Sequence, residues 1–374
     1  MRILPAILCV FAAASTGSCA PHDATGSRSA ESATSGHPAA SGQPPADRAS
    51  ASSPASSSSP ASASAPASAS AAPSPGAACG PISLPLEVTG AFQKSRSKVY
   101  AKSEPHHFAM DAVTSPSSDV TLRAKFTYGS AGKDLEEELV AFFVRSSGSC
   151  TFTEIGRAET DDDGWARFSQ RGVALPVGAH EFAAAVVGDG TFATAKLFVA
   201  ARGTKTVVFD VDATLTTSDR EVVDEVLKGK VPEMRPDAPT VVQAYAKAGF
   251  FVAFVTGRPY LLLRPTKQWL EDRGFPVGYV RVTDRSSDSI PDEEGVQRFK
   301  ESALLELKAA GLTLDQAYGN AKTDICAYLH AGLDPKRTFI LGPHAGSPCG
   351  ASSPTVGLES YTLQLPRLAS LTSP

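Results

Sequence analysis

From residue 203 onward, the hydrophobic and polar positions of the chain follow two alternating patterns. Short apolar runs rich in β-branched and aromatic residues, such as TVVF at 206–209, are typical of buried parallel strands. Segments with the spacing of amphipathic helices follow them, and Gly249 and Gly311 end two of these segments. Alternating strands and helices predict an α/β domain built on a five-stranded, mainly parallel sheet. The strands are expected at 206–209, 249–256, 277–283, 314–319 and 337–341, and the helices at about 218–228, 237–248, 259–273, 295–310 and 323–331.

Residues 81–200 show a different pattern, in which short alternating segments are separated by turn sequences such as DDDG at 161–164. Evenly spaced strands with such turns predict an immunoglobulin-like β-sandwich. We interpret Trp165 and Phe168 as core or sheet-face residues, and the pair at 106–107 as structural or surface histidines. The strands are expected at 97–101, 120–128, 139–144, 151–155, 165–168, 180–187 and 191–199.

The amino-terminal residues predict export. Arg2, an apolar run at 3–14 and the small residues after it are typical of a signal peptide that is too short to span a bilayer. Cys19 follows TGS and resembles the cysteine of a bacterial lipobox, although Thr16 stands where an aliphatic residue is usual. We prefer lipidation of Cys19 over simple secretion. The chain then divides into a leader (1–19), a disordered Ala/Ser/Pro tether (20–78), the β-sandwich (79–202) and the α/β domain (203–374).

The charge and the cysteine content narrow the class of protein. The net charge is −4 over 374 residues, so nothing suggests a nucleic-acid partner. Outside the leader there are four cysteines, which allow three pairings in an oxidising compartment. Domain logic favours disulfides Cys79–Cys150 and Cys326–Cys349, and the alternative is free buried thiols. No spacing of Cys and His indicates a zinc site.

Candidate chemistry begins where the first α/β strand ends, at Asp210, Asp212 and Thr214. Residues two apart lie on one side of a strand, so both carboxylates leave it together. Ligands of doubly wound folds bind at the carboxyl ends of the strands. Two acids in this place can bind a divalent cation and divide nucleophilic and acid/base roles between them. The alternative is a strand that ends in an acidic turn.

Further candidates lie at the other strand ends. After the second strand, the Thr256 hydroxyl can bind phosphate, Gly257 allows close approach of the backbone, and Arg258 follows. Lys300 lies on the helix after the third strand, where a lone lysine is usually solvated. The alternative for the second strand end is a capped turn between a strand and a helix.

The fourth strand ends in the sequence GNAKTD at 319–324. Asn320 and Asp324 supply oxygen ligands of the kind that magnesium prefers. The alternative is an Asx-type turn followed by a carboxylate that the helix dipole favours.

In this order the four segments resemble the four motifs of the haloacid-dehalogenase (HAD) superfamily, whose fold is Rossmann-like. FVTGRP at 254–259, FK at 299–300 and GNAKTDICAY at 319–328 are similar to the LNS2 domain. Lipin phosphatidate phosphatases and the large RdgB-type phosphatidylinositol transfer proteins share that domain. Residues 178–204 resemble the end of the β-sandwich that precedes LNS2 in the RdgB group.

The resemblance implies a mechanism. Asp210 would attack phosphorus and form an aspartyl-phosphate, and Asp212 would protonate the leaving oxygen and then activate water. Thr256 would hydrogen-bond the phosphoryl oxygens, and Lys300 would stabilise their negative charge. Thr214, Gly257 and Arg258 would contact the substrate. Mg²⁺ would be held by Asp210, the backbone carbonyl of Asp212, Asn320 and Asp324.

Two features refine the expected site. Ala213 stands where the family usually has glycine, so a positive φ there would strain the loop. Only about forty residues separate Thr214 from Thr256, and the interval from Arg258 to Lys300 is equally short. Neither interval leaves room for a large cap domain, so we expect an open site.

We therefore expect a Mg²⁺-dependent phosphatase that hydrolyses a phosphomonoester, with phosphatidate favoured by the resemblance. The alternative is a phospholipid-binding module without turnover. The expected partners are a phospholipid or small phosphoester and a bacterial membrane, reached through the lipid anchor on the periplasmic side. The helix at 259–273, with Arg264, Lys267 and Arg273, either contacts anionic headgroups or is an ordinary core helix with a solvated basic face. The sequence indicates neither a protein partner nor an oligomeric state.

Overall fold

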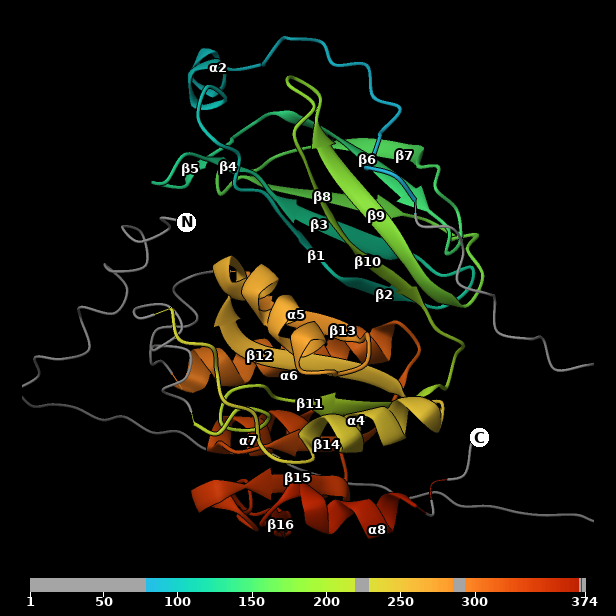
Figure 1. Ribbon diagram of the computed structural model, residues 1–374, viewed down its shortest axis with the longest axis vertical. Coiled ribbons are helices and arrows are strands. Elements are labelled where there is room, and N and C mark those ends of the chain that lie inside the picture. Colours follow the sequence, from blue (N-terminus) through green and yellow to red (C-terminus); the bar gives the residue numbers. More distant parts are fainter. Residues whose placement is uncertain (1–78, 219–228, 285–292, 370, 372–374) are drawn as a thin grey trace, which may run out of the picture. The chain divides into compact units, whose positions relative to one another are not determined.

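The computed structural model describes residues 79–218, 229–284, 293–369 and 371. The leader, the lipidation site and the tether lie outside the described residues, and so does nearly all of the helix expected at 218–228. In Figure 1, strands drawn in blue-green to green form the β-sandwich, and elements drawn in yellow to red form most of the α/β domain.

The β-sandwich consists of two main sheets whose strands alternate buried side chains between two faces. Phe142 and Phe182 lie in the core between the sheets, whereas their neighbours Phe143 and Ala183 pack on the opposite face against residues 82–86. This is the period of two that a strand requires. One sheet has the order β1 (Phe108–Met110), β3 (Val120–Lys125), β8 (Trp165–Gln170), and the other β2 (Ala112–Thr114), β10 (Phe192–Val199), β9 (Gly178–Val186), β6 (Leu139–Arg145), β7 (Thr153–Glu159). A separate pair is formed by β4 (Thr127–Tyr128) and β5 (Lys133–Asp134).

One of the expected sandwich strands is a helix instead. Residues 97–101 were expected to be extended, but α2 (Ser95–Tyr100) covers most of them. Its side chains reverse the burial that a core strand would need, because Ser97 is buried and Val99 is 61% exposed. The apparent alternation was therefore misleading. The other expected segments each contain a strand. Phe168 packs against the sandwich core, as predicted. Trp165 is a core residue too, but it packs in the core of the α/β domain, where its ring lies edge-on to that of Tyr260.

The α/β domain contains a parallel sheet with six strands, not five. Its order is β13 (Tyr279–Thr283), β12 (Phe251–Pro259), β11 (Lys205–Phe209), β14 (Thr313–Gly319), β15 (Thr338–Leu341), β16 (Val356–Leu358), and neighbouring strands run parallel throughout. The additional strand β16 has only three residues, one of them glycine, so no hydrophobic pattern could reveal it.

Helices cover both faces of this sheet. Val207 and Phe209 of β11 pack in the core that α4 (Ala238–Lys247) and α5 (Leu263–Asp272) share, whereas Val208 packs in the core of α6 (Glu293–Ala309) and α7 (Lys322–His330). The first connection after β11 leads to β12 and the later ones to β14 on its other side. The crevice of a doubly wound fold lies at this reversal, beyond the carboxyl ends of β11 and β14. The remaining elements are η2 (Tyr260–Leu262), η4 (Pro335–Arg337), η5 (Gly342–His344), η6 (Tyr361–Gln364) and α8 (Leu365–Leu368).

Both predicted disulfides are present. Cys79–Cys150 joins the start of the sandwich to the β6–β7 turn, with the Cα atoms 5.4 Å apart. Cys326–Cys349 joins α7 to the segment after β15, with the Cα atoms 5.1 Å apart. The described residues between Thr214 and Thr256 (215–218 and 229–255) and between Arg258 and Lys300 (259–284 and 293–299) form no separate cap domain.

Asp111 connects the sandwich to the α/β domain. Its side chain is 1% exposed, and Oδ1 accepts hydrogen bonds from the Lys196 backbone N–H (2.9 Å) and from Lys267 Nζ (2.6 Å). Its Oδ2 accepts one from the Val280 backbone N–H (3.0 Å). A single carboxylate thus satisfies donors from β10, α5 and β13.

The basic residues of α5 and the turn after it make contacts within the chain. Besides the Lys267 contact to Asp111, Arg264 donates to the His107 carbonyl (2.9 Å) and Arg273 to the Pro232 carbonyl (3.1 Å). The apolar side of the helix is buried, with Trp269 only 3% exposed. These contacts agree with an ordinary core helix rather than with one whose cations are free for lipid headgroups.

Candidate active site

Asp210 lies at the centre of the candidate site, directly after β11. It is 2% exposed, and its Oδ1 accepts a hydrogen bond from Lys300 Nζ at 2.7 Å. Its Oδ2 accepts one from the Thr214 hydroxyl at 2.9 Å. Burial raises the pKa of Asp210 to about 7; Lys300 opposes this rise, and the nearby acids Asp324 and Asp212 add to it. A carboxylate that is costly to keep ionised and that faces the crevice is a candidate nucleophile.

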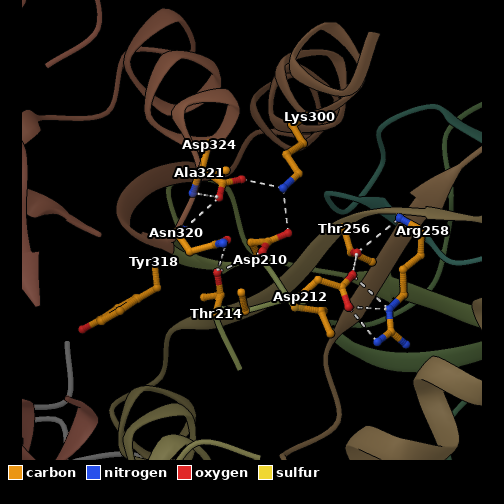
Figure 2. A network of polar contacts seen from close by, with 12 residues as sticks. Asp210, Asp212, Thr214, Thr256, Arg258, Lys300, Tyr318, Asn320, Ala321 and Asp324 are labelled. Carbon is orange, nitrogen blue, oxygen red and sulfur yellow. Dashed lines mark hydrogen bonds and ion pairs between the residues drawn. The ribbon is translucent and has the colours of Figure 1, made fainter. Parts of the chain in front are cut away.

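Lys300 holds two carboxylates at once. Its Nζ donates to Asp210 and also to Asp324 Oδ1 at 2.5 Å, and the lysine is only 4% exposed (Figure 2). Burial tends to lower the pKa of this ammonium, but the two carboxylates outweigh burial and raise it, so Lys300 stays charged. A lone lysine on a helix is usually solvated; here α6 aims it inward at the strand ends.

Asp212 belongs to a second group of side chains, separate in Figure 2 from the group around Lys300. Arg258 donates to its carboxylate through Nε (3.1 and 3.0 Å) and Nη2 (2.8 Å). The Thr256 hydroxyl donates to Asp212 Oδ2 at 3.1 Å. The predicted second strand end therefore meets the first one, and Arg258 holds the predicted acid/base directly.

Asp324 and Asn320 lie where the fourth strand passes into α7. Asp324 Oδ2 accepts the backbone N–H groups of Asn320 (2.9 Å) and Ala321 (3.0 Å), so its carboxylate also caps the helix start. The Asn320 Oδ1 atom lies 3.0 Å from the Thr214 hydroxyl, whose single proton is shared between this oxygen and Asp210 Oδ2. Sequence reasoning gave no role to Gly319, yet a Cβ there would lie 2.6 to 2.8 Å from atoms of the Asp324 side chain. Its missing side chain makes room for Asp324.

Ala213 has the backbone conformation that glycine would favour, with φ of +52°. The conditional prediction of a strained loop is thus fulfilled. Its N–H donates to the Thr216 hydroxyl (2.9 Å), and its carbonyl accepts from Arg235 Nε (3.1 Å) and Nη2 (2.8 Å). Arg235 was missed because its partner is a backbone carbonyl, which leaves no mark in the residue pattern.

Gly257 is packed close to α6. A Cβ at this position would lie 3.2 Å from Val296 Cγ1, tighter than an ordinary contact. The close approach that we observe is therefore to the helix that carries Lys300. Contact between Gly257 and a substrate stays a prediction.

The oxygen donors fit a magnesium ion. Among the described residues, no three Asp, Glu, His or Cys side chains form a metal cage by themselves. The expected set needs only the carboxylates of Asp210 and Asp324, joined by Asn320 Oδ1 and the Asp212 carbonyl. Mg²⁺ is typically bound by one or two carboxylates, with water and substrate phosphate completing the shell. The three acids also outnumber the cations Lys300 and Arg258, which favours an added positive charge.

Two family comparisons agree with this geometry. Residues 207–342 match the description "PITM 1-3, LNS2 domain", and residues 105–199 match "PITM 1-3, beta-sandwich domain". The chain carries a PITM-type β-sandwich followed by an LNS2 domain. The LNS2 match contains every predicted site residue from Asp210 to Asp324.

Relatives share both domains. Membrane-associated phosphatidylinositol transfer protein 1 of Homo sapiens is 29% identical over 257 residues, which cover 67% of this chain and 20% of the relative. Protein retinal degeneration B of Drosophila melanogaster is 26% identical over 253 residues, which cover 67% of this chain and 19% of the relative. The matches thus span about a fifth of these relatives.

One of the solved structures similar to this chain is described as a HAD-like phosphatase from Mesorhizobium loti. It aligns with 46% of this chain and 87% of its own, at 16% identity and a TM-score of 0.36. The described residues of the present chain contain no helix with the length and apolar character needed to cross a membrane.

Proposed function

We propose that the LNS2 domain hydrolyses phosphomonoesters with Mg²⁺ through an aspartyl-phosphate. The observation that carries this proposal is the buried Lys300, which bonds both Asp210 and Asp324 at the carboxyl edge of the sheet. Burying three charges in one place costs free energy that an apolar core would not. This cost is expected where Mg²⁺ and a phosphoryl group bind together, because the metal would offset the excess of carboxylates and the ammonium would face the phosphoryl oxygens.

The first step forms a bond between an oxygen of Asp210 and phosphorus while the ester P–O bond breaks. Asp212 donates a proton to the departing oxygen, which leaves as an alcohol. Asp212, now a carboxylate, then takes a proton from water as that water attacks phosphorus. Inorganic phosphate leaves, and Asp210 is regenerated as a carboxylate.

The other side chains of the site bind the phosphoryl group or hold the reacting side chains in place. The Thr256 hydroxyl and the Lys300 ammonium stabilise the phosphoryl oxygens as their negative charge grows. The Thr214 hydroxyl contacts both Asp210 and Asn320 and so fixes the position of one side chain relative to the other. Mg²⁺ held by Asp210, the Asp212 carbonyl, Asn320 and Asp324 would neutralise charge on the phosphate. Arg258 and Thr256 must release the Asp212 carboxylate when substrate enters.

Phosphate release tests this function. The full chain is assayed with p-nitrophenyl phosphate, glycerol 3-phosphate and phosphatidate vesicles, with Mg²⁺ and with chelator. We expect release that chelator abolishes, and a loss of at least ~1000-fold for Asp210→Asn because the nucleophile is gone. Asp272→Asn, at an exposed carboxylate that ends α5, serves as the matched control. Activity retained by Asp210→Asn would remove Asp210 from its role.

A second function is favoured by the contacts of Asp212. Both its oxygens are engaged by Arg258 and Thr256, which suits a site that binds a phosphorylated lipid without turning it over. The names of the relatives, which are phosphatidylinositol transfer proteins, point the same way. Saturable binding of phosphatidate vesicles with no release of phosphate under any condition would establish this function instead.

The proposed site of action is a membrane surface. Relatives of this chain are named as membrane-associated proteins, and lipidation of Cys19 would hold the LNS2 domain near lipid. Cys19→Ser should move the protein from the membrane fraction to the soluble fraction of the cell envelope. A variant that stays with the membranes would refute the anchor.

A further inference from the structure

A pocket of about 310 Å³ opens beside the nucleophile. Its lining includes Ala213, Asn320 and Ala321 of the two strand-end loops, together with Arg235 and His344. Because Ala213 follows Asp212 and because Asn320 Oδ1 lies 3.0 Å from the Thr214 hydroxyl, the pocket borders the group of side chains around Asp210. Its volume suits a small polar fragment next to the phosphoryl group.

The described wall is rich in hydrogen-bond donors. Arg235 uses Nε and Nη2 on the Ala213 carbonyl, while its Nη1 has no partner among the described residues. Asn320 accepts a bond through Oδ1, so its amide NH₂ is the end left for a ligand. The imidazole of His344 and the hydroxyl of Ser218 also lack a partner within the described part of the chain.

The same wall offers few favourable contacts to a cationic ligand or to an apolar one. No carboxylate is among the described lining residues, and their only apolar members are Ala213, Ala321, Gly342 and Pro343. An acyl chain would gain almost no apolar contact here. An anionic group, in contrast, would find a guanidinium already fixed in place by two bonds, which reduces the entropy lost on binding.

Resting on the proposed phosphatase function, we propose that the pocket formed by Ser218, Arg235, Asn320 and His344 binds a second anionic group of the substrate. This group is a phosphate or carboxylate a few bonds away from the phosphoryl group that is transferred. The substrate is then a phosphomonoester with two anionic ends, either a free small molecule or a lipid headgroup. Phosphatidate, whose one phosphate would be at the nucleophile, leaves the pocket unused.

Calorimetric binding to the full chain carrying Asp210→Asn tests the pocket without turnover. Glycerol 3-phosphate and 3-phosphoglycerate form a matched pair, because the second carries a carboxylate where the first has a hydroxymethyl group. We expect 3-phosphoglycerate to bind about tenfold more tightly in the presence of Mg²⁺, through charge-assisted hydrogen bonds. The lipid arm compares phosphatidylcholine vesicles that contain phosphatidate with vesicles that contain phosphatidylinositol 4-phosphate.

Substitutions test which pocket residues cause the preference for the doubly anionic ligand. His344→Ala should reduce the ratio of the two affinities about threefold, and Arg235→Gln should abolish most of it, because Arg235 carries the permanent charge. Arg235 also donates to the Ala213 carbonyl, so the thermal unfolding of the Arg235 variant is measured to detect a loss of stability. The His344 variant leaves those bonds in place and therefore tests the pocket separately. Lys336→Ala, which removes an exposed cation near the opposite end of β15, should keep the ratio.

The outcomes separate the pocket from the reaction. Equal affinity for both members in the soluble and the lipid arm, or no binding in either, overturns the subsite. Phosphate release by the wild-type chain together with equal affinities keeps the phosphatase and rejects the subsite. A clear preference for the doubly anionic ligand without any phosphate release keeps the subsite and rejects the phosphatase. Preference confined to one arm identifies the source of the anion.

Discussion

Two buried polar clusters, one in the β-sandwich and one in the LNS2 domain, differ in whether their buried titratable side chains are charged. In the sandwich, His107 Nε2 is hydrogen-bonded to the Thr191 hydroxyl (2.9 Å), and the Tyr128 hydroxyl bonds both Thr191 (2.9 Å) and Asp189 (2.7 Å). Burial lowers the pKa of His107 to about 4 and raises that of Tyr128, so both stay neutral. In the LNS2 domain, Lys300 remains charged between two carboxylates.

This difference is the one expected between a structural cluster and a cluster that binds a charged ligand. In the sandwich cluster, the buried His107 and Tyr128 are neutral, and the one carboxylate that Tyr128 contacts among the described residues, that of Asp189, is only half-buried. The charged cluster keeps an ammonium and acids where neutral groups could have filled the space, which is expected where a charged ligand is bound. Both clusters are buried, so burial alone would not have told them apart.

The largest effect is expected for Lys300→Met. Removal of the ammonium leaves Asp210 and Asp324 facing each other in a buried site, so we expect a loss of about 3–5 kcal/mol in the free energy of unfolding, together with loss of phosphate release. Mg²⁺ should restore part of the stability, because a cation again lies between the acids. Denaturant unfolding with Mg²⁺ and with chelator measures this. A variant as stable as the wild type in chelator would show that the cluster is not held by charge.

The sandwich cluster should respond to pH instead. The pKa of His107 is about 4 in the folded chain, against 6.5 for a histidine exposed to water, so below pH 6.5 the unfolded chain takes up a proton that the folded chain does not. Stability should therefore fall as pH falls from 6.5 towards 4, by about 3 kcal/mol from this residue. His107→Gln cannot be protonated, and its stability should fall less over this range. Parallel curves for the two proteins would contradict the assignment.

The smallest effect concerns Ala213→Gly. A left-handed φ costs an alanine about 1 kcal/mol, and glycine loses part of that gain to the entropy of the unfolded chain. We expect the variant to be more stable by about 0.5 kcal/mol, with the bonds from Arg235 retained. Unfolding midpoints in denaturant measure this difference. A less stable variant would mean that the methyl group, only 8% exposed as part of Ala213, contributes packing that outweighs the strain.

The sequence predicted the parts of the site that follow from strand ends. Asp210, Thr256 and Asp324 were placed together because parallel strands deliver their carboxyl ends to one edge. Lys300 was predicted from the resemblance to the HAD superfamily and not from the hydrophobic pattern, because the pattern does not show whether a lysine on a helix points into the site or into solvent. The disulfides followed from the order of the domains.

What the sequence did not predict depends on contacts between distant segments. Arg258 was expected to bind substrate, yet in the structure it holds Asp212, 46 residues away. Arg235 supports the Ala213 carbonyl 22 residues earlier, and no periodicity encodes such a pair. The helix α2 and the strand β16 were missed for a related reason: short segments take the conformation that their neighbours impose.

Asp111 has a consequence for how the chain can be divided. If the protein were cut near Arg202, the LNS2 half would lose the acceptor for the Val280 N–H and the partner of Lys267. Arg123 of the sandwich would likewise leave Glu306, which lies on the helix that carries Lys300. We therefore expect an expression boundary at the domain junction to yield a fragment weakened at β13 and at α6, the helix that carries Lys300.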